Sequence, residues 1–277
     1  MSQVIGEAVS LRLSTGYQES SSNMAIYDKP VRFLMKDMVN AFGLQNGQSF
    51  VRQQAIDWFA QHYPKIKKGT ITAHLIRLSV NASSRLHYSP KAGEDDLFFQ
   101  IDSNHFRLYD AKQDLPPIHD TTSASQLQES EVLEEEINLG ISTEFAYESD
   151  LRDYLAKNLQ VIEPGLKLYE EEGITGVEFP VGKRFIDILG VDSNGDFIVI
   201  ELKVSRGYDR VIGQLLRYMA WIQKNQAELV QKVRGIIVAR EISEDLMLAC
   251  SLMPNVELFE YELSLSLRQV NLVSSDT

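Results

Sequence analysis

Two apolar segments decide the fold of the C-terminal half: Arg184-Phe-Ile-Asp-Ile-Leu-Gly and, after a short turn, Phe197-Ile-Val-Ile-Glu-Leu-Lys-Val. Their composition is typical of paired strands that are buried on both faces. Three charged residues interrupt them, Asp187, Glu201 and Lys203. Side chains alternate along a strand, so Glu201 and Lys203 share one face. Buried charges are costly unless they pair with each other or with a metal ion, and the hairpin is therefore the first place to expect chemistry.

The sequence around this hairpin predicts an α/β domain with a mixed sheet, because helices and strands alternate in it. A helix with a buried leucine stripe precedes the hairpin, and a strongly amphipathic helix follows it. The predicted helices are 144–159, 209–224 and 243–251, and the other extended segments are 162–168, 177–179, 235–239 and 256–261.

The N-terminal part has a different pattern, three helices followed by a hairpin. The predicted helices span 31–42, 50–63 and about 69–84, and a first extended segment covers 86–88. The hairpin strands are 97–101 and 106–109, around the Asp102-Ser-Asn turn. This order is that of a winged helix, a variant of the helix-turn-helix group.

The third predicted helix offers a face for DNA. Ile71, Leu75 and Leu78 are spaced to face a core, which leaves a second, polar face. A lysine cluster precedes the helix N-terminus, where peptide N–H groups also attract phosphate. The predicted DNA contacts are Lys65, Lys67, Lys68, Thr70, His74, Arg77 and Asn81. The alternatives are an ordinary solvated face, or a winged helix that docks protein.

Charge and composition change along the 277 residues and predict where the segments of the chain begin and end. Segment 28–91 carries ten basic and three acidic residues although the whole chain has a net charge of −12, and segment 94–150 is strongly acidic. We expect an arm at 1–26 with one strand at 9–13, the winged helix at 27–112, an acidic linker at 113–143 with a short helix at 130–137, and the α/β domain at 144–277. The single Cys250 excludes an intrachain disulfide framework. No signal segment or membrane span is visible, so we expect a cytoplasmic protein.

The hairpin can bring Asp187 and Glu201 together on one face of the sheet. Two carboxylates suit Mg²⁺, with Mn²⁺ as a substitute, and the Leu202 carbonyl can supply a third oxygen. A lysine at position 203 can orient or deprotonate water, or stabilise a phosphorane-like transition state. The alternative is a structural network of ion pairs.

Ile186-Asp187 with Glu201-Leu-Lys203 resembles the core motif of the PD-(D/E)xK nuclease superfamily, with Ile in place of the proline. The segments 181–190, 199–203 and 213–218, with 148–155 and 162–166 upstream, are similar to the C-terminal catalytic domain of the NucS/EndoMS endonucleases. The similarity covers roughly residues 144–262. The N-terminal part departs from that family and resembles modules fused to restriction-type nucleases, so mismatch specificity does not follow from it.

The resemblance implies roles for single residues. Asp187 and Glu201 would be metal ligands, Lys203 the catalytic lysine, and Glu148 an acid from the first helix. Gln214 and Tyr218 match the Q-x-x-x-Y signature of RecB-like members, with Arg217 between them facing DNA or the surface. For Glu148 a role at the helix N-terminus is the alternative, and for Gln214 and Tyr218 helix packing.

These observations predict a Mg²⁺-dependent DNA endonuclease of restriction or repair type, acting on DNA that is expected to be double-stranded. A homodimer would place two sites on opposite strands. The alternatives are a non-catalytic DNA-binding or assembly protein that keeps a nuclease fold, and a nuclease directed at RNA.

Overall fold

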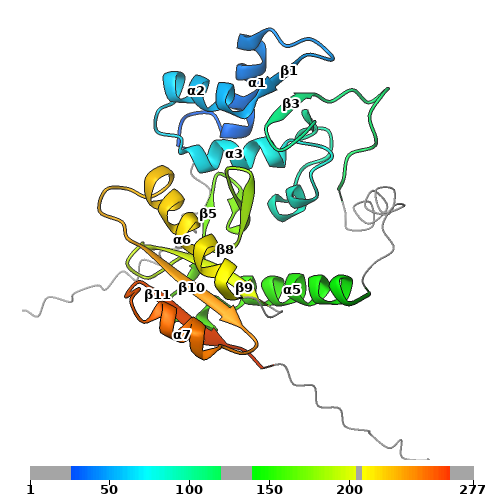
Figure 1. Cartoon of the computed structure of the whole chain (residues 1–277). Helices are drawn as coiled ribbons and strands as arrows, with labels where there is room; N and C mark the ends of the chain where they lie inside the picture. Colours follow the sequence, from blue (N-terminus) through cyan, green and yellow to red (C-terminus); the bar gives the residue numbers. More distant parts are fainter. Residues whose placement is uncertain (1–25, 120–138, 204–207, 263–277) are drawn as a thin grey trace, which may run out of the picture.

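The computed structural model describes residues 26–119, 139–203 and 208–262. Figure 1 shows an N-terminal module (residues 26–119) above a C-terminal α/β domain (residues 139–262), with helix α3 lying between them. No helix of these ranges is long and apolar enough to cross a membrane. The predicted arm strand at 9–13 and linker helix at 130–137 lie outside the described residues.

The N-terminal module contains three helices and a small antiparallel sheet. The sheet has the order β1-β3-β2, and the hairpin β2–β3 is the one predicted. The elements are α1 (Val31–Phe42), β1 (Ser49–Val51), α2 (Arg52–His62), α3 (Lys68–Arg77), the 3₁₀ helix η2 (Ser83–Tyr88), β2 (Phe98–Gln100) and β3 (His105–Leu108). The third helix is shorter than predicted, and residues 86–88 form part of η2 rather than a strand. The winged-helix assignment stays a prediction.

The C-terminal domain is a mixed sheet with helices on both faces, as predicted. Its elements are α5 (Leu139–Lys157), η3 (Leu159–Val161), β4 (Lys167–Leu168), β5 (Glu170–Glu171), β6 (Ile174–Thr175), β7 (Val177–Val181), β8 (Arg184–Val191), β9 (Phe197–Lys203), α6 (Tyr208–Asn225), β10 (Val233–Ala239), α7 (Glu244–Cys250) and β11 (Val256–Glu260). The small β5–β6 hairpin was not predicted from the sequence.

Strand β9 lies in the middle of this sheet. The strand order is β11-β10-β9-β8-β4, and β7 pairs with the first part of β8. β9 runs antiparallel to β8 and parallel to β10, which in turn runs parallel to β11. A central strand covered on both faces must be apolar in both directions, and this explains the run 197–202.

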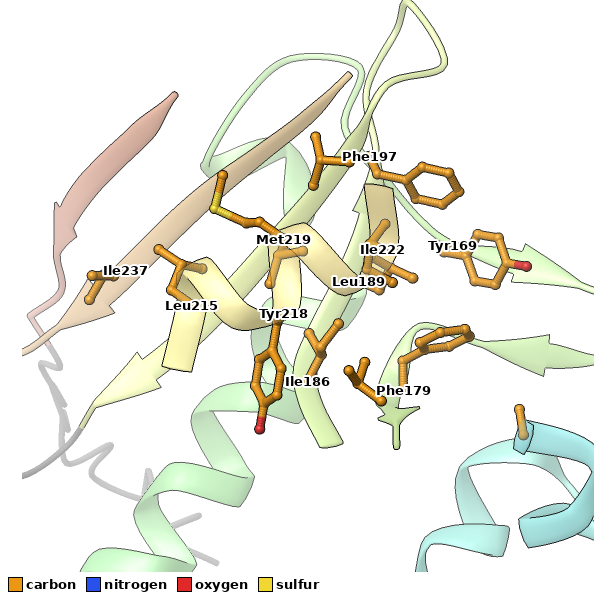
Figure 2. Close-up of a cluster of buried hydrophobic side chains, with 14 of the residues drawn as sticks. Tyr169, Phe179, Ile186, Leu189, Phe197, Leu215, Tyr218, Met219, Ile222 and Ile237 are labelled. Carbon is orange, nitrogen blue, oxygen red and sulfur yellow. The ribbon is translucent and has the colours of Figure 1, made fainter. Parts of the chain in front are cut away.

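Alternate residues of the central strands point into two separate cores. Ile198, Ile200 and Leu202 pack with leucines of α5, whereas Val199 packs on the other face against α6 and α7. Figure 2 shows this second core, with Leu215, Met219 and Ile222 of α6 lying over the strands. The amphipathic pattern of α6 therefore reflects how it covers the sheet.

Helix α3 belongs to two cores at once. Ile71, Leu75 and Leu78 face the core of the N-terminal module, as their spacing predicts. Ala73 and Ile76, on the opposite side, pack in the core of the α/β domain. A helix that is buried all round joins the layers on either side of it, so the two modules form one body.

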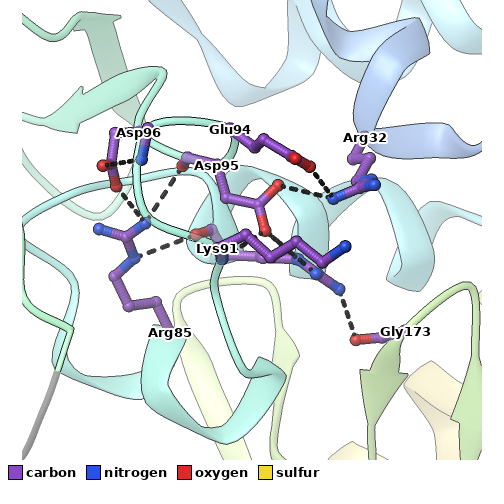
Figure 3. A network of polar contacts seen from close by, with 9 residues as sticks. Arg32, Arg85, Lys91, Glu94, Asp95, Asp96 and Gly173 are labelled. Carbon is purple, nitrogen blue, oxygen red and sulfur yellow. Dashed lines mark hydrogen bonds and ion pairs between the residues drawn. The ribbon is translucent and has the colours of Figure 1, made fainter.

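A polar network on α3 and η2 supports this junction (Figure 3). The Arg77 guanidinium donates to Asp95 of its own module and, through Nη1, to the Gly173 carbonyl of the other at 2.8 Å. Fully buried Arg85 donates to the Asp95 carbonyl and to Asp96. Because these charges are paired under the surface, breaking one pair leaves its partner buried and unpaired.

The contact between modules also requires a glycine in α3. A Cβ at Gly69 would lie 2.8 Å from the Phe179 ring of β7 and closer still to the Gln226 side chain, so Gly69→Ala requires both side chains to move from their packed positions. We expect a loss of about 1–3 kcal/mol in the free energy of unfolding, measured by urea denaturation.

The matched control is Gly213→Ala in helix α6. A Cβ there meets no atom within 4 Å, so alanine should be neutral or stabilise the helix by up to about 1 kcal/mol. Equal stability of the two variants would contradict the packing described for α3.

Candidate active site

The site forms where β8 separates from β9. Their pairing ends at Ile188 opposite Ile200, and the preceding residues of β8 pair with β7 instead. The Leu202 N–H, which has lost its strand partner, donates to Asp187 Oδ2 at 2.8 Å. Within a strand the N–H and C=O of one residue face the same neighbour, so the Leu202 carbonyl also faces this gap.

Glu201 lies on β9 next to the gap and is completely buried. Its Oε2 accepts a hydrogen bond from the side-chain amide of Gln214 at 2.6 Å. Gln214 belongs to α6, which packs over the strand. The Glu201 Oε1 is buried and has no hydrogen-bond partner. A buried carboxylate oxygen without a partner is expensive, and it marks a position that suits a ligand.

Lys203 follows on the same face of β9 and is partly exposed. Its Nζ lies 3.9 Å from Glu148 Oε1 of helix α5. Glu148, Asp187, Glu201 and Lys203 therefore meet at one end of the sheet, although three different elements supply them. The sequence predicted this grouping, while the role of each residue remains a prediction.

Burial and neighbouring charges govern the two central carboxyls. Burial raises the pKa of Asp187, against the N–H bond from Leu202 and the charge of Lys203, which lower it. Burial and then the charge of Asp187 raise the pKa of Glu201. The raised pKa values mean that the carboxylate forms are unfavourable in this site. A cation bound between the two groups would stabilise both carboxylates.

Helix α6 brings Gln214 and Tyr218 to the same place, four residues apart on one face. Tyr218 is buried at the edge of the apolar cluster in Figure 2. Burial and the negative charge of Glu201 raise the pKa of its phenol to about 12, so it stays a neutral hydrogen-bonding group. Arg217, between them, is exposed on the helix surface.

The donor set suits a hard divalent cation with an incomplete protein shell. Asp187, Glu201 through its unpaired oxygen, and the Leu202 carbonyl are oxygen donors around one gap. The residues that the structure describes contain no cluster of three His, Cys, Asp or Glu side chains able to hold a metal alone. Mg²⁺ commonly keeps several waters and completes its shell with substrate phosphate, so two carboxylates suffice.

Sequence reasoning missed Glu178 and Arg152, which lie beside the site. Glu178 on β7 accepts hydrogen bonds from Ser84 of the N-terminal module and from Arg152 of α5, and His87 lies 3.6 Å away. Burial alone would raise its pKa, but the bonds from His87 and Ser84 and the charge of Arg152 lower it to about 2. In the sequence, an acidic residue within the otherwise apolar run 177–181 could have indicated a buried, paired carboxylate.

The DNA-reading face predicted for α3 is wrong for three of its residues. Thr70, His74 and Arg77 are buried where α3 meets the α/β domain. Thr70 bonds Glu171, and the His74 ring bonds the Thr70 carbonyl at 2.9 Å. The physical reason is that small and polar side chains suit a close helix–sheet contact as well as a groove of DNA.

The remaining predicted DNA contacts differ in their surroundings. Asn81 bonds both backbone groups of Gln100 and so anchors β2. Lys67 forms an ion pair with Glu228 at 2.5 Å. Lys65 is exposed and Lys68 partly exposed, so these two remain available to a ligand.

The N-terminal and C-terminal parts of the chain match different protein families. Residues 147–259 match the family model of the endonuclease NucS C-terminal domain. The resemblance of the C-terminal part to the NucS/EndoMS endonucleases is confirmed. Residues 30–108 match a domain family of unknown function, DUF7669.

The similar curated proteins are endonucleases NucS. That of Thermococcus kodakarensis is 34% identical over 97 residues, 35% of this chain and 34% of the relative. That of Sulfolobus acidocaldarius is 33% identical, over 40% of this chain and 39% of the relative. The chain thus matches only about a third to two fifths of the length of these proteins.

Two solved structures are also similar. A repair endonuclease from Pyrococcus abyssi has 26% identity and a TM-score of 0.35, over 46% of this chain and 49% of that one. An EndoMS–dsDNA complex has 28% identity and a TM-score of 0.34, over 47% and 48%.

Glu178 should make stability depend on pH. Its pKa is lowered in the folded state, so its contribution is full above the ordinary value of 4.5 and declines as pH falls toward 2. We expect Glu178→Gln to cost about 2–3 kcal/mol at pH 7 and about 1 kcal/mol less at pH 3.5, by urea unfolding.

Glu170→Gln, at an exposed position of β5, is the control and should change stability little at either pH. A Glu178→Gln penalty that stays the same at both pH values would show that its ionised form is not stabilised by these partners.

Proposed function

We propose that this protein is a metal-dependent endonuclease that hydrolyses phosphodiester bonds in DNA. One observation carries the proposal: Glu201 is buried in the central strand beside Asp187, with one oxygen unpaired and Lys203 on the same face. The similarity of residues 147–259 to the catalytic domain of endonuclease NucS supports the same reaction class. Mg²⁺ is the proposed cofactor, and Mn²⁺ should replace it.

In the proposed reaction, different residues bind the metal ion, position a ligand and stabilise charge. Asp187, Glu201 and the Leu202 carbonyl would hold the cation, which when bound would polarise the phosphoryl oxygen and favour ionisation of the attacking water. Gln214 fixes the Glu201 carboxylate through its 2.6 Å hydrogen bond. Lys203, next to Glu148 and partly open to solvent, can orient the water and stabilise the charge that develops on the phosphate.

Glu148 has a supporting role in this scheme. Its Oε1 lies 3.9 Å from the Lys203 Nζ, and this ion pair would hold the lysine side chain in position at the site. Cutting both strands of a duplex takes two active sites, and a two-fold pair of chains would supply them. The N-terminal module, fixed rigidly beside the site, would help to place the DNA.

The first test of the function is cleavage of supercoiled plasmid by Glu201→Gln and Lys203→Met. We expect each to lower the rate at least 100-fold, because the first removes a charged ligand and the second a cationic group next to the reacting phosphate. The matched controls are Glu170→Gln and Lys167→Met, both at exposed positions, which should cleave at the wild-type rate.

If the wild type binds DNA but cleaves none with any divalent cation, the chain is a non-catalytic protein with a nuclease fold. Preferential cleavage of an RNA strand of the same sequence would make it an RNA-directed nuclease. Either result would overturn the proposal.

The second test is the metal requirement. EDTA should abolish cleavage, and Mg²⁺ or Mn²⁺ in excess should restore it. Ca²⁺, which prefers a larger and more flexible oxygen shell, should support binding better than turnover. Full cleavage in EDTA would contradict a role for the carboxylate pair as metal ligands.

A further inference from the structure

A groove lies between the two modules. It has a volume of about 160 Å³, and α2 and α3 line one side while the β7–β8 turn and α6 line the other. The residues that line it are Arg52, Gln53, Ile56, Lys68, Thr72, Asn104, Gly182, Lys183 and Trp221. It exists only because α3 fixes the N-terminal module against the α/β domain.

The lining of the groove is basic in an acidic protein. Three of the lining residues carry a positive charge and none carries a negative one, although the chain has a net charge of −12. Among the described residues, neither Lys68 nor Lys183 has an ion-pair partner. Uncompensated positive charge along a groove is the electrostatic footprint expected of a nucleic-acid backbone site.

Arg52 makes the groove a built site rather than a patch of surface lysines. Its side chain lines the groove although the residue is only 8% exposed, and its Nε has no hydrogen-bond partner. Its Nη2 donates to the Ser103 carbonyl, which holds the guanidinium in place. The guanidinium therefore adds a fixed positive charge to the wall of the groove, which favours a phosphate there.

Helix α3 adds to this potential. It begins at Lys68 and has no side-chain cap at its N-terminus, so the positive end of its dipole lies beside the groove. This second source of positive charge reinforces the arginine and the two lysines.

Two elements that line the groove also carry residues of the candidate site. Trp221 lies seven residues after Gln214 on α6, or about 10 Å along the helix. Lys183, in the turn just before β8, precedes Asp187 by four residues, or at most about 13 Å of extended chain. A DNA strand carries one charge per 3.4 Å of axis. A phosphate about three or four nucleotides from the scissile bond would therefore reach the groove.

We propose that this groove, which both modules build, binds the sugar–phosphate backbone of the DNA strand that is being cut. This inference rests on the proposed nuclease function and adds a contact that the C-terminal domain alone does not possess. The DUF7669 module then acts in substrate binding through α2 and the start of α3, not through the middle of α3.

The test compares Lys68→Glu/Lys183→Glu with Lys112→Glu/Lys167→Glu, which makes the same change of net charge at exposed positions outside the groove. Binding of a fluorescein-labelled 20-bp duplex is measured by anisotropy in Ca²⁺, from 50 to 200 mM salt. We expect the groove variant, Lys68→Glu/Lys183→Glu, to bind at least 10-fold more weakly at 100 mM salt. The slope of log K against log salt concentration should fall in magnitude by about 2. The Lys68→Arg/Lys183→Arg variant should bind like the wild type.

Hydrolysis of bis(p-nitrophenyl) phosphate, a diester too small to span the groove and the site, separates the two proposals. The groove variant should keep wild-type diester hydrolysis while losing DNA affinity. If the wild type hydrolyses neither diester nor DNA, the endonuclease proposal fails, while the anisotropy still decides the groove. Equal DNA affinity of the groove and control variants would overturn the groove proposal.

Discussion

The structure depends on one constraint: an ionisable side chain, Glu201, is buried in the middle of a central strand. Burial of a carboxyl without adequate partners costs several kcal/mol, and neighbouring segments are arranged around it. Gln214 of α6 donates to one of its oxygens, and Lys203 follows on the same face of β9. Where the pairing of β8 with β9 ends, the Asp187 side chain accepts the Leu202 N–H. Apolar residues on both sides of the sheet support a site that would be unstable alone.

The second organising feature is helix α3, which is buried on both sides. Ile71 and Leu75 belong to one core and Ala73 and Ile76 to the other, so the helix connects the modules as a shared element. The N-terminal module therefore has a fixed position relative to the carboxylates of the candidate site. This fixed position is what allows residues of α2 and α3 to line a groove together with residues of the α/β domain.

Much of the C-terminal fold was predictable because its signals are local. The apolar runs 184–190 and 197–202 predicted the buried hairpin, and three charges within them predicted the site. The face of α3 was not predictable in the same way, since Thr70, His74 and Arg77 fit either DNA or a protein junction. Only the tertiary contact with Glu171 and Gly173 distinguishes the two. The same holds for Glu178, whose partners come from segments more than twenty residues away.

A crystal structure of the full chain, grown with Mn²⁺ and recorded at the manganese absorption edge, tests most directly whether the buried carboxylates bind a metal ion. We expect one strong anomalous peak in the gap between β8 and β9, from a manganese ion bound by Asp187, Glu201 and the Leu202 carbonyl. The Asp187→Asn/Glu201→Gln variant should lack that peak. A wild-type map without anomalous density at this gap, at saturating Mn²⁺, would contradict the claim that the buried carboxylates form a metal-dependent nuclease centre.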